Sequence, residues 1–172
     1  MLQVATHAPS AHNSQPWEFV VVQDEQVRRQ VSTVARNSWE QARSIAQGAI
    51  DPDMFGDVDR FIEVSDFGGA PVLIVLGVDL DRVSEAVAGC SIYPAAQNLM
   101  LAAAALGYAS AFTNFTVSAN DSLGEVIGFP HHVAPYGIVS LGRSARPLGP
   151  PRRESIFDKA HRDRYGQRWR SD

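Results

Sequence analysis

The sequence predicts an α+β or α/β fold in which helices cover a β-sheet around one hydrophobic core. Three short apolar runs, at 19–22, 70–78 and 136–142, have the composition of buried strands. Helical periodicity separates these runs, and no internal repeat marks a second unit. With 172 residues, 45% of them hydrophobic, the chain has the size of one ordinary domain. We therefore expect a single domain over residues 1–172.

Two helices are predicted after the first strand. Asp24 is a favoured N-cap residue, and it precedes an apolar stripe at helical spacing formed by Val27, Val31 and Val34. Ser38 stands at capping-box spacing and predicts the start of a second, short helix that ends near Gly48. Residues 50–69 have many acids and no periodicity. We expect them to form a long loop that covers an active site.

A long helix is predicted after the second strand. Pro94 stands either in the first turn of a helix over 92–106 or inside a longer helix that begins near Asp81. Gly107 supplies its C-terminal stop. Alanines on nearly every side predict that this helix is buried all round. One helical face, expected in the core, carries Val83, Val87 and Cys90, and we expect the cysteine to be unreactive.

The composition excludes several classes of function. Fifteen basic against nineteen acidic residues give a formal charge of −4, which argues against a nucleic-acid partner. A single cysteine excludes a disulfide framework and a thiolate-rich metal site, and we expect no metal. The longest apolar stretch is too short to span a membrane and the first residues do not resemble a signal peptide, so a cytoplasmic location is expected. Dinucleotide and phosphate-loop motifs are missing, so a cofactor would have to carry any redox chemistry.

Charge is distributed unevenly along the chain. Residues 51–66 hold six acids and one base, whereas residues 143–170 hold nine bases and three acids. The simpler interpretation is a solvated acidic loop and a solvated basic tail. The alternative is that the basic tail holds an anion and grips another subunit.

Residues 8–17 form a dense polar loop before the first strand. They read Ala8-Pro9-Ser10-Ala11-His12-Asn13-Ser14-Gln15-Pro16-Trp17. The two prolines stiffen the backbone, the neutral polar side chains offer donors and acceptors, and the tryptophan offers an aromatic wall. This combination suits a planar heterocycle with imide and carbonyl edges. The alternative is a purely structural turn.

Three segments resemble the FMN-dependent nitroreductase family. The pattern Pro9-Ser10-x-x-Asn13-Ser14-Gln15-Pro16-Trp17 with the strand after it resembles that family's flavin-contacting loop. Residues 93–107 resemble its dimerisation helix, and residues 141–143, 150–153 and 161–166 resemble its C-terminal signature. The resemblance implies an α+β, three-layer fold with a central mixed sheet wrapped by helices. It also implies a homodimer with FMN at the interface.

The resemblance further implies a cofactor site shared by two subunits. The implied contacts are Pro9, Ser10, Ala11, Asn13, Gln15, Thr113, Asn114, Arg143, Arg152 and Arg153. The first five would line the flavin from one subunit, and the Thr-Asn pair would lie near its N5/O4 edge. Arg152 or Arg153 would pair with the phosphate. Arg143 would either join them or form a structural pair, and Trp17 is expected to pack in the core. Residues 143–172 would form an arm that reaches the partner subunit.

The implied activity is electron transfer from NAD(P)H to a nitroaromatic, quinone or similar acceptor by a ping-pong mechanism. No acid or base side chain is required for it. Family members usually carry an arginine-rich segment before the loop, and nothing before Pro9 replaces it here. This departure leaves open a shortened start, loose flavin binding, or a non-catalytic relative that binds or sequesters flavin. A deazaflavin partner or another flavin-dependent reaction would use the same fold.

Overall fold

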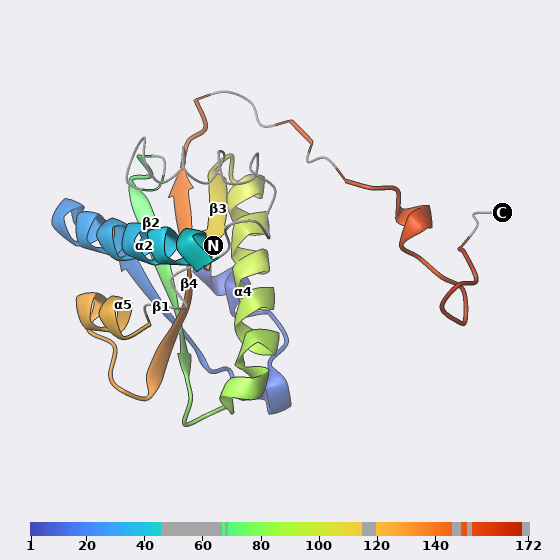
Figure 1. Ribbon diagram of the computed structural model, residues 1–172, viewed down its shortest axis with the longest axis horizontal. Coiled ribbons are helices and arrows are strands. Elements are labelled where there is room, and N and C mark those ends of the chain that lie inside the picture. The colour runs from blue at the N-terminus through green and yellow to red at the C-terminus, as the bar shows by residue number, and fades with distance from the viewer. Residues whose placement is uncertain (46–66, 68, 115–119, 146–148, 151–152, 170–172) are drawn as a thin grey trace.

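The computed structural model describes residues 1–45, 67, 69–114, 120–145, 149–150 and 153–169. The elements, in chain order, are α1 (Leu2–Ala5), η1 (Ala11–Asn13), β1 (Trp17–Val22), α2 (Glu25–Ile45), β2 (Val72–Asp79), α4 (Glu85–Ala105), β3 (Ala109–Thr113), α5 (Asn120–Ile127), β4 (Val133–Gly142) and η3 (Ile156–Asp158). Helices and strands thus form one α+β arrangement, as predicted (Figure 1). The predicted loop at 50–69 lies, except for Phe67 and Gly69, outside the described residues.

The four strands form one sheet in the order β1-β2-β4-β3. All three neighbouring pairs are antiparallel, so the expectation of mixed strand directions is not met by the described strands. The register of β1 and β2 gives the physical reason. Val22, the last residue of β1, pairs with Leu73 near the start of β2, so β2 begins at the end of the sheet where β1 finishes.

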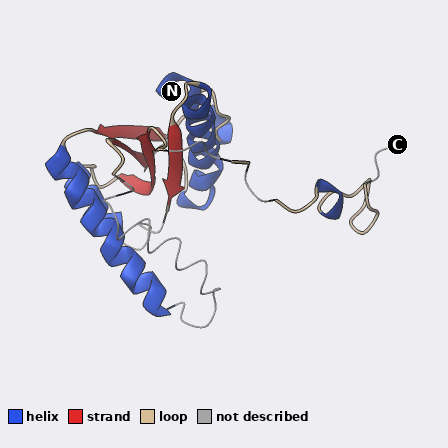
Figure 2. Ribbon diagram, turned by 90° about the horizontal axis from the view of Figure 1, so that it is seen from above, coloured by secondary structure: helices blue, strands red, loops and turns tan. Residues whose placement is uncertain are grey.

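Helices cover both faces of this sheet and make three layers (Figure 2). On one face, α1 and α4 pack on one side of β1, β2 and β4, and Ile92 and Leu99 of α4 are fully buried there. On the other face, α2 and α5 close a second cluster around Val31 and Leu123, both also fully buried. The central strand β2 contributes to both clusters, which explains its continuous apolar sequence.

The helix α2 is continuous from Glu25 to Ile45, so the prediction of a second helix starting at Ser38 is wrong. Asp24 acts as the predicted N-terminal cap, since its Oδ1 accepts the Val27 N–H at 2.9 Å. The Ser38 hydroxyl instead donates to the Val34 carbonyl at 3.0 Å, one turn earlier. Its hydrogen bond is therefore made within the helix, and no cap is formed.

The helix α4 is one helix from Glu85 to Ala105 with Pro94 inside it, which selects the longer of the two predicted helices. The predicted core face is wrong: Val83 is buried but precedes the helix, Val87 is 38% exposed, and Cys90 is exposed. Burial all round is also wrong for the single chain, because Leu101 is 58% exposed. The helix carries small apolar residues on all of its sides, so its sequence does not show which side the sheet covers.

The strand β3 was not predicted. It follows α4 directly, and its sequence Ala-Ser-Ala-Phe-Thr continues the small-residue composition of the helix. Gly107, with a φ of 76°, ends the helix as predicted and allows the chain to turn back toward the sheet. The three predicted strands correspond to β1, β2 and β4.

Candidate functional site

The polar loop at 10–15 is held in a conformation that most residues avoid. His12, Asn13 and Gln15 have φ angles of 53°, 54° and 49°, in the left-handed region. A non-glycine residue in such a region costs on the order of 1–3 kcal/mol. Three of them within four residues persist because the surrounding structure holds them. Strain of this kind is concentrated at binding and catalytic sites.

Hydrogen bonds within the loop and to α4 fix its first half. The Ser10 Oγ accepts the Gln15 N–H at 3.1 Å, which closes the loop on itself. The Ala11 N–H donates to the Ser91 Oγ, also at 3.1 Å, and Ser91 is fully buried on α4. Sequence reasoning missed Ser91, because it lies 80 positions from Ala11 in the chain.

The second half of the loop is held by the corner between β2 and α4. The Arg82 Nη1 lies 3.4 Å from the carbonyl oxygens of both Ser14 and Gln15. The Asp79 N–H donates to the Pro16 carbonyl at 2.8 Å. The side chains of Asn13 and Gln15 are exposed and hydrogen-bonded to each other at 3.4 Å, so their amide groups face outward.

Trp17 lies at the start of β1 and is 9% exposed, among the residues that pack under α4. This confirms that it belongs to the core. Pro9 is exposed, whereas Ser10 and Ala11 are half-buried. The loop therefore stands on a rigid apolar base with its polar groups accessible.

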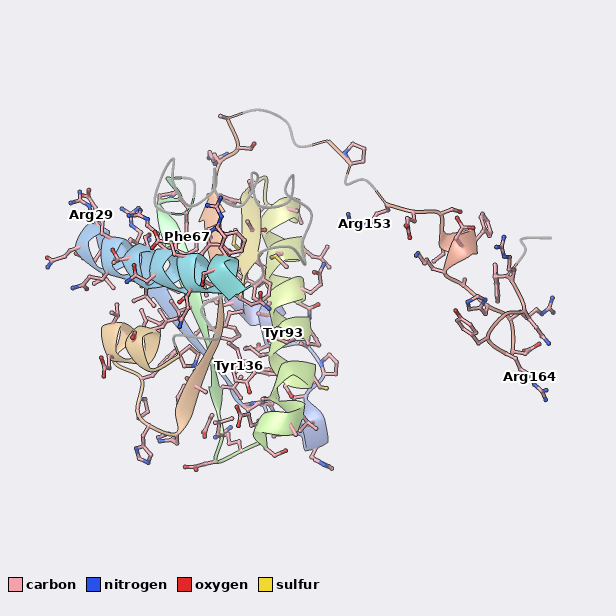
Figure 3. All side chains as sticks on the ribbon, viewed as in Figure 1. Arg29, Phe67, Tyr93, Tyr136, Arg153 and Arg164 are labelled. Carbon is pink, nitrogen blue, oxygen red and sulfur yellow. The ribbon has the colours of Figure 1, made fainter. Side chains whose placement is uncertain are left out.

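Thr113 and Asn114 lie at the end of β3. Thr113 is buried and pairs with Ile138 of β4, and Asn114 is exposed. Beside them, the Phe112 ring packs edge-on against Tyr93 of α4, with centroids 5.8 Å apart (Figure 3 labels Tyr93). Tyr93 and Ser91 are two positions apart, which places them about 200° apart around the helix. The loop at 10–15 and Thr113 therefore lie on opposite flanks of α4 within one chain.

A β-bulge adjoins this second flank. Gly137 pairs with Leu76 and Pro135 pairs with Gly77, which leaves Tyr136 between them unpaired. The Tyr136 hydroxyl lies 3.5 Å from the Glu85 carbonyl of α4. Burial, and then the charge of Glu85, raise the pKa of Tyr136, so its phenol stays neutral near pH 7. It is therefore a hydrogen-bond donor to α4 in this position.

The structure places Arg143 and Arg153 away from the loop. The Arg143 guanidinium carbon lies 4.9 Å from the centre of the Tyr108 ring, a cation–π contact at the end of β4. Arg153 is exposed on the segment that leads away from the sheet (Figure 3). Arg152 lies outside the described residues. The structure thus brings Pro9 to Gln15 together, and it places Thr113 and Arg153 elsewhere.

A large apolar cavity of about 1190 Å³ lies beside α1 and the end of α4. Its lining includes Val21 of β1, Ile74 of β2 and Leu141 of β4. Arg143 also lines it, whereas the loop residues 9–15 do not. This cavity and the loop are therefore two different surfaces of the same chain.

Asp79, Asp81 and His132 form a small cluster at the far end of β2, with one ligand atom of each within 4.8 Å of the others. The Asp79 carboxylate is already engaged there. Its Oδ1 accepts the Asp81 N–H at 2.9 Å, and its Oδ2 lies 3.4 Å from the Arg82 Nε. Asp79 of this cluster therefore stabilises the turn between β2 and α4, from which Arg82 contacts the loop.

Comparison with known proteins adds independent findings. The sequence model of the Nitroreductase family matches residues 1–143. A relative from Methanothermobacter thermautotrophicus, whose name assigns it provisionally as an NADH dehydrogenase/NAD(P)H nitroreductase, is 26% identical over 163 residues, which are 92% of this chain and 69% of that protein.

Solved structures share the fold. A nitroreductase with bound FMN from Desulfitobacterium hafniense aligns with a TM-score of 0.70 and 24% identity over 95% of this chain and 84% of the other. A BluB-like flavoprotein from Clostridium difficile aligns with a TM-score of 0.72 and 19% identity over 95% and 86% of the two chains. Among the described residues, no helix combines the length and hydropathy needed to cross a membrane.

Proposed function

This chain belongs to the nitroreductase family by its match over residues 1–143, and we propose that it is an FMN-dependent oxidoreductase. In this proposal it transfers electrons from NAD(P)H to a nitroaromatic, quinone or similar acceptor by a ping-pong mechanism. The observation that carries the proposal is the strained, accessible loop at 10–15, whose sequence resembles the family's flavin-contacting loop.

The donor set of this loop fits the edge of an isoalloxazine ring. Asn13 and Gln15 present neutral amides at the surface, and the half-buried Ser10 and Ala11 lie beside them. Neutral donors and acceptors match the imide and carbonyl groups of a flavin without placing a charge against the ring. Because the loop is already held in place, binding would not need to order it.

When bound, FMN would accept a hydride from NAD(P)H and deliver electrons to the acceptor. The chain's part is to bind and orient the ring while leaving one of its faces open to the two substrates in turn. No side chain of the loop is an acid or base suited to proton transfer except His12, which is exposed. Solvent would supply the protons, so we assign no catalytic side chain.

We further propose that the site is completed by a second copy of the chain. The loop and Thr113 lie on opposite flanks of α4, so in this proposal each flavin contacts the loop of one chain and Thr113 of the other. The side of α4 that the sheet does not cover carries exposed apolar residues, Val87 and Leu101 among them. A homodimer packed through this helix would bury them and bring the loop of one subunit toward Thr113 and Asn114 of the other.

The C-terminal segment supports the same arrangement. Four large apolar side chains on it are exposed in the single chain: Ile156, Phe157, Tyr165 and Trp169. Figure 1 shows this segment leading away from the sheet. Apolar groups at this density in a basic segment favour an arm that packs on the partner. On this arm Arg152 or Arg153 would pair with the flavin phosphate, where a guanidinium suits a dianion.

The alternative function is a non-catalytic member that binds or sequesters flavin. One observation favours it. Arg82, a cation that contacts the loop, donates to two carbonyl groups and pairs with Asp79, so it is not directed at a phosphate. In this reading the chain would hold the ring through the loop and would not support turnover.

The test is NADH or NADPH oxidation by the purified protein after saturation with FMN, with a nitroaromatic and a quinone as separate acceptors. We expect bound flavin in the visible spectrum and acceptor-dependent oxidation of the nicotinamide. Heat-denatured protein with the same free FMN is the control. Bound FMN without turnover would select the non-catalytic alternative, and a failure to bind FMN would reject both.

A further inference from the structure

We propose that Ser91 and Arg82 are positioning residues that clamp the loop at 10–15 from outside it. The proposal rests on the proposed function only in what the loop binds, because the clamp itself consists of contacts within this chain. Neither residue belongs to the loop or to the contacts implied by the family resemblance. Together they would decide how the amides of Asn13 and Gln15 are presented to a flavin.

The first anchor is the Ser91 hydroxyl. Ser91 is fully buried on α4, and its Oγ accepts the Ala11 N–H at 3.1 Å across 80 positions of sequence. A buried hydroxyl is retained where it satisfies a polar group that would otherwise lose its partner. Here that partner is the first residue of η1, immediately before the left-handed His12. The anchor therefore stands where the strained part of the loop begins.

The second anchor is the Arg82 guanidinium. Its Nη1 lies 3.4 Å from each of two successive carbonyl oxygens, those of Ser14 and Gln15. Gln15 is the last left-handed residue of the loop, with a φ of 49°. A cationic donor shared by two carbonyl groups favours the backbone conformation that points both of them the same way. This anchor therefore stands where the strained part ends.

Asp79 orients the second anchor. Its Oδ2 lies 3.4 Å from the Arg82 Nε, and its side chain is only 16% exposed. The Asp79 N–H also donates to the Pro16 carbonyl at 2.8 Å. The end of β2 is thus joined to the loop by a backbone bond and by a paired side chain. Because β2 is a central strand of the sheet, these contacts connect the anchor to the core.

The clamp accounts for a conformation that the loop's own residues do not favour. Three left-handed residues lie between two external anchors, and the Ser10–Gln15 hydrogen bond closes the loop between them. Removing either anchor should let the segment relax toward ordinary backbone angles. The fold should remain, because the apolar clusters on both faces of the sheet do not include the loop's polar residues.

The experiment compares Arg82→Gln, Arg82→Lys and Ser91→Ala with the wild-type protein. Arg29→Gln is the matched control for charge, because Arg29 is exposed on α2 and pairs with Glu25 there. Ser84→Ala is the matched control for the hydroxyl, because Ser84 precedes α4 and its side chain makes no capping bond. Two readouts are used: amide hydrogen exchange of the peptide covering residues 8–17 in flavin-free protein, and titration with FMN followed by flavin fluorescence and visible circular dichroism.

We expect faster exchange in the 8–17 peptide for Arg82→Gln and Ser91→Ala, with the other peptides unchanged. Loss of one such hydrogen bond should weaken FMN binding about tenfold and alter the circular dichroism of the bound flavin. Arg82→Lys, which keeps one donor, should recover part of the affinity. The two control variants should match the wild type in every measurement.

Unchanged exchange and unchanged FMN affinity in both Arg82→Gln and Ser91→Ala would overturn the clamp. If Ser91→Ala does not fold, the two Arg82 variants alone test the clamp. They are expected to fold because the Arg82 side chain is mostly exposed. Failure of the wild-type protein to bind FMN would instead count against the proposed function. In that case the exchange rates of the loop peptide would still support or reject the clamp.

Discussion

Residues 10–15 and residues 153–169 both carry predicted cofactor contacts. They differ in whether they pack on the rest of the same chain. The loop consists mostly of polar residues, yet its hydrogen bonds with Ser91 and Arg82 hold it against the body of the chain. The C-terminal segment carries large apolar residues, yet it exposes them, with Tyr165 at 93% and Ile156 at 66%. One chain is therefore sufficient to build the loop. The C-terminal segment requires another surface to bury its apolar groups, and we propose a second copy as that surface.

The largest effect, on dimerisation and on FMN affinity, should come from a charge on the side of α4 that the sheet does not cover. Leu101→Arg places a guanidinium where we propose that two helices meet, and burial of an unpaired charge is strongly unfavourable. We expect light scattering to show a monomer, with FMN affinity lowered more than a hundredfold by loss of the shared site. Asn37→Arg on the exposed surface of α2 is the control. A Leu101→Arg protein that stays dimeric would remove α4 from the proposed interface.

A smaller effect on FMN affinity should come from the arginines of the C-terminal arm. This effect should depend on the phosphate group of FMN. Arg152→Gln and Arg153→Gln would each remove one charge-assisted hydrogen bond, worth about 1.5–3 kcal/mol. We expect FMN binding to weaken by about tenfold or more, whereas riboflavin, which has no phosphate, should bind with unchanged affinity. Parallel titrations with the two flavins measure the difference. Equal losses for both flavins would show that these arginines do not contact the phosphate.

A third effect concerns the loop's stored strain. Gln15 has a φ of 49°, which a β-branched side chain tolerates poorly. Gln15→Val should lower the free energy of unfolding by about 1–2 kcal/mol. Gln15→Gly should leave it nearly unchanged, because the relief of strain is offset by the greater conformational freedom of glycine in the unfolded chain. Denaturant unfolding of the two variants gives the comparison. If both variants unfold alike, the left-handed conformation at this position carries no cost.

The smallest effect concerns the stability of the fold at alkaline pH and involves Tyr136, which lies outside both regions. Burial raises the pKa of Tyr136 above its ordinary value near 10. The folded chain then holds this proton more tightly than the unfolded chain. Its contribution to stability is complete below that ordinary pKa and is lost as pH rises through the raised one. Thermal unfolding from neutral to alkaline pH should show a shallower alkaline decline in Tyr136→Phe than in the wild type. Identical pH profiles would contradict the assignment.

Several features of the fold could be predicted because they depend on local physics. The strands β1, β2 and β4 follow from runs of Val, Ile and Leu, and the Asp24 cap and the Gly107 stop follow from backbone chemistry that acts over a few residues. The loop at 10–15 stood out because its residue types combine rigidity with polarity. The family, too, was identified from these local motifs, and the match over residues 1–143 bears this out.

The features that could not be predicted depend on which surfaces meet. The face of α4 that the sheet covers could not be chosen from a sequence that is apolar all round, so Cys90 and Val87 were placed in the core when they are exposed. Ser38 has the residue type of a cap, and only the continuous packing of α2 shows that its hydroxyl bonds within the helix.

The sequence by itself determined the strands β1, β2 and β4, the place of the polar loop and the family to which the chain belongs, because these depend on residues close together along the chain. Only the tertiary structure decided that Ser91 and Arg82 hold that loop, and that Thr113 lies on the other flank of α4. Such contacts join positions many residues apart. Nothing in the local pattern of either partner encodes them, because they exist only once the helix has packed on the sheet.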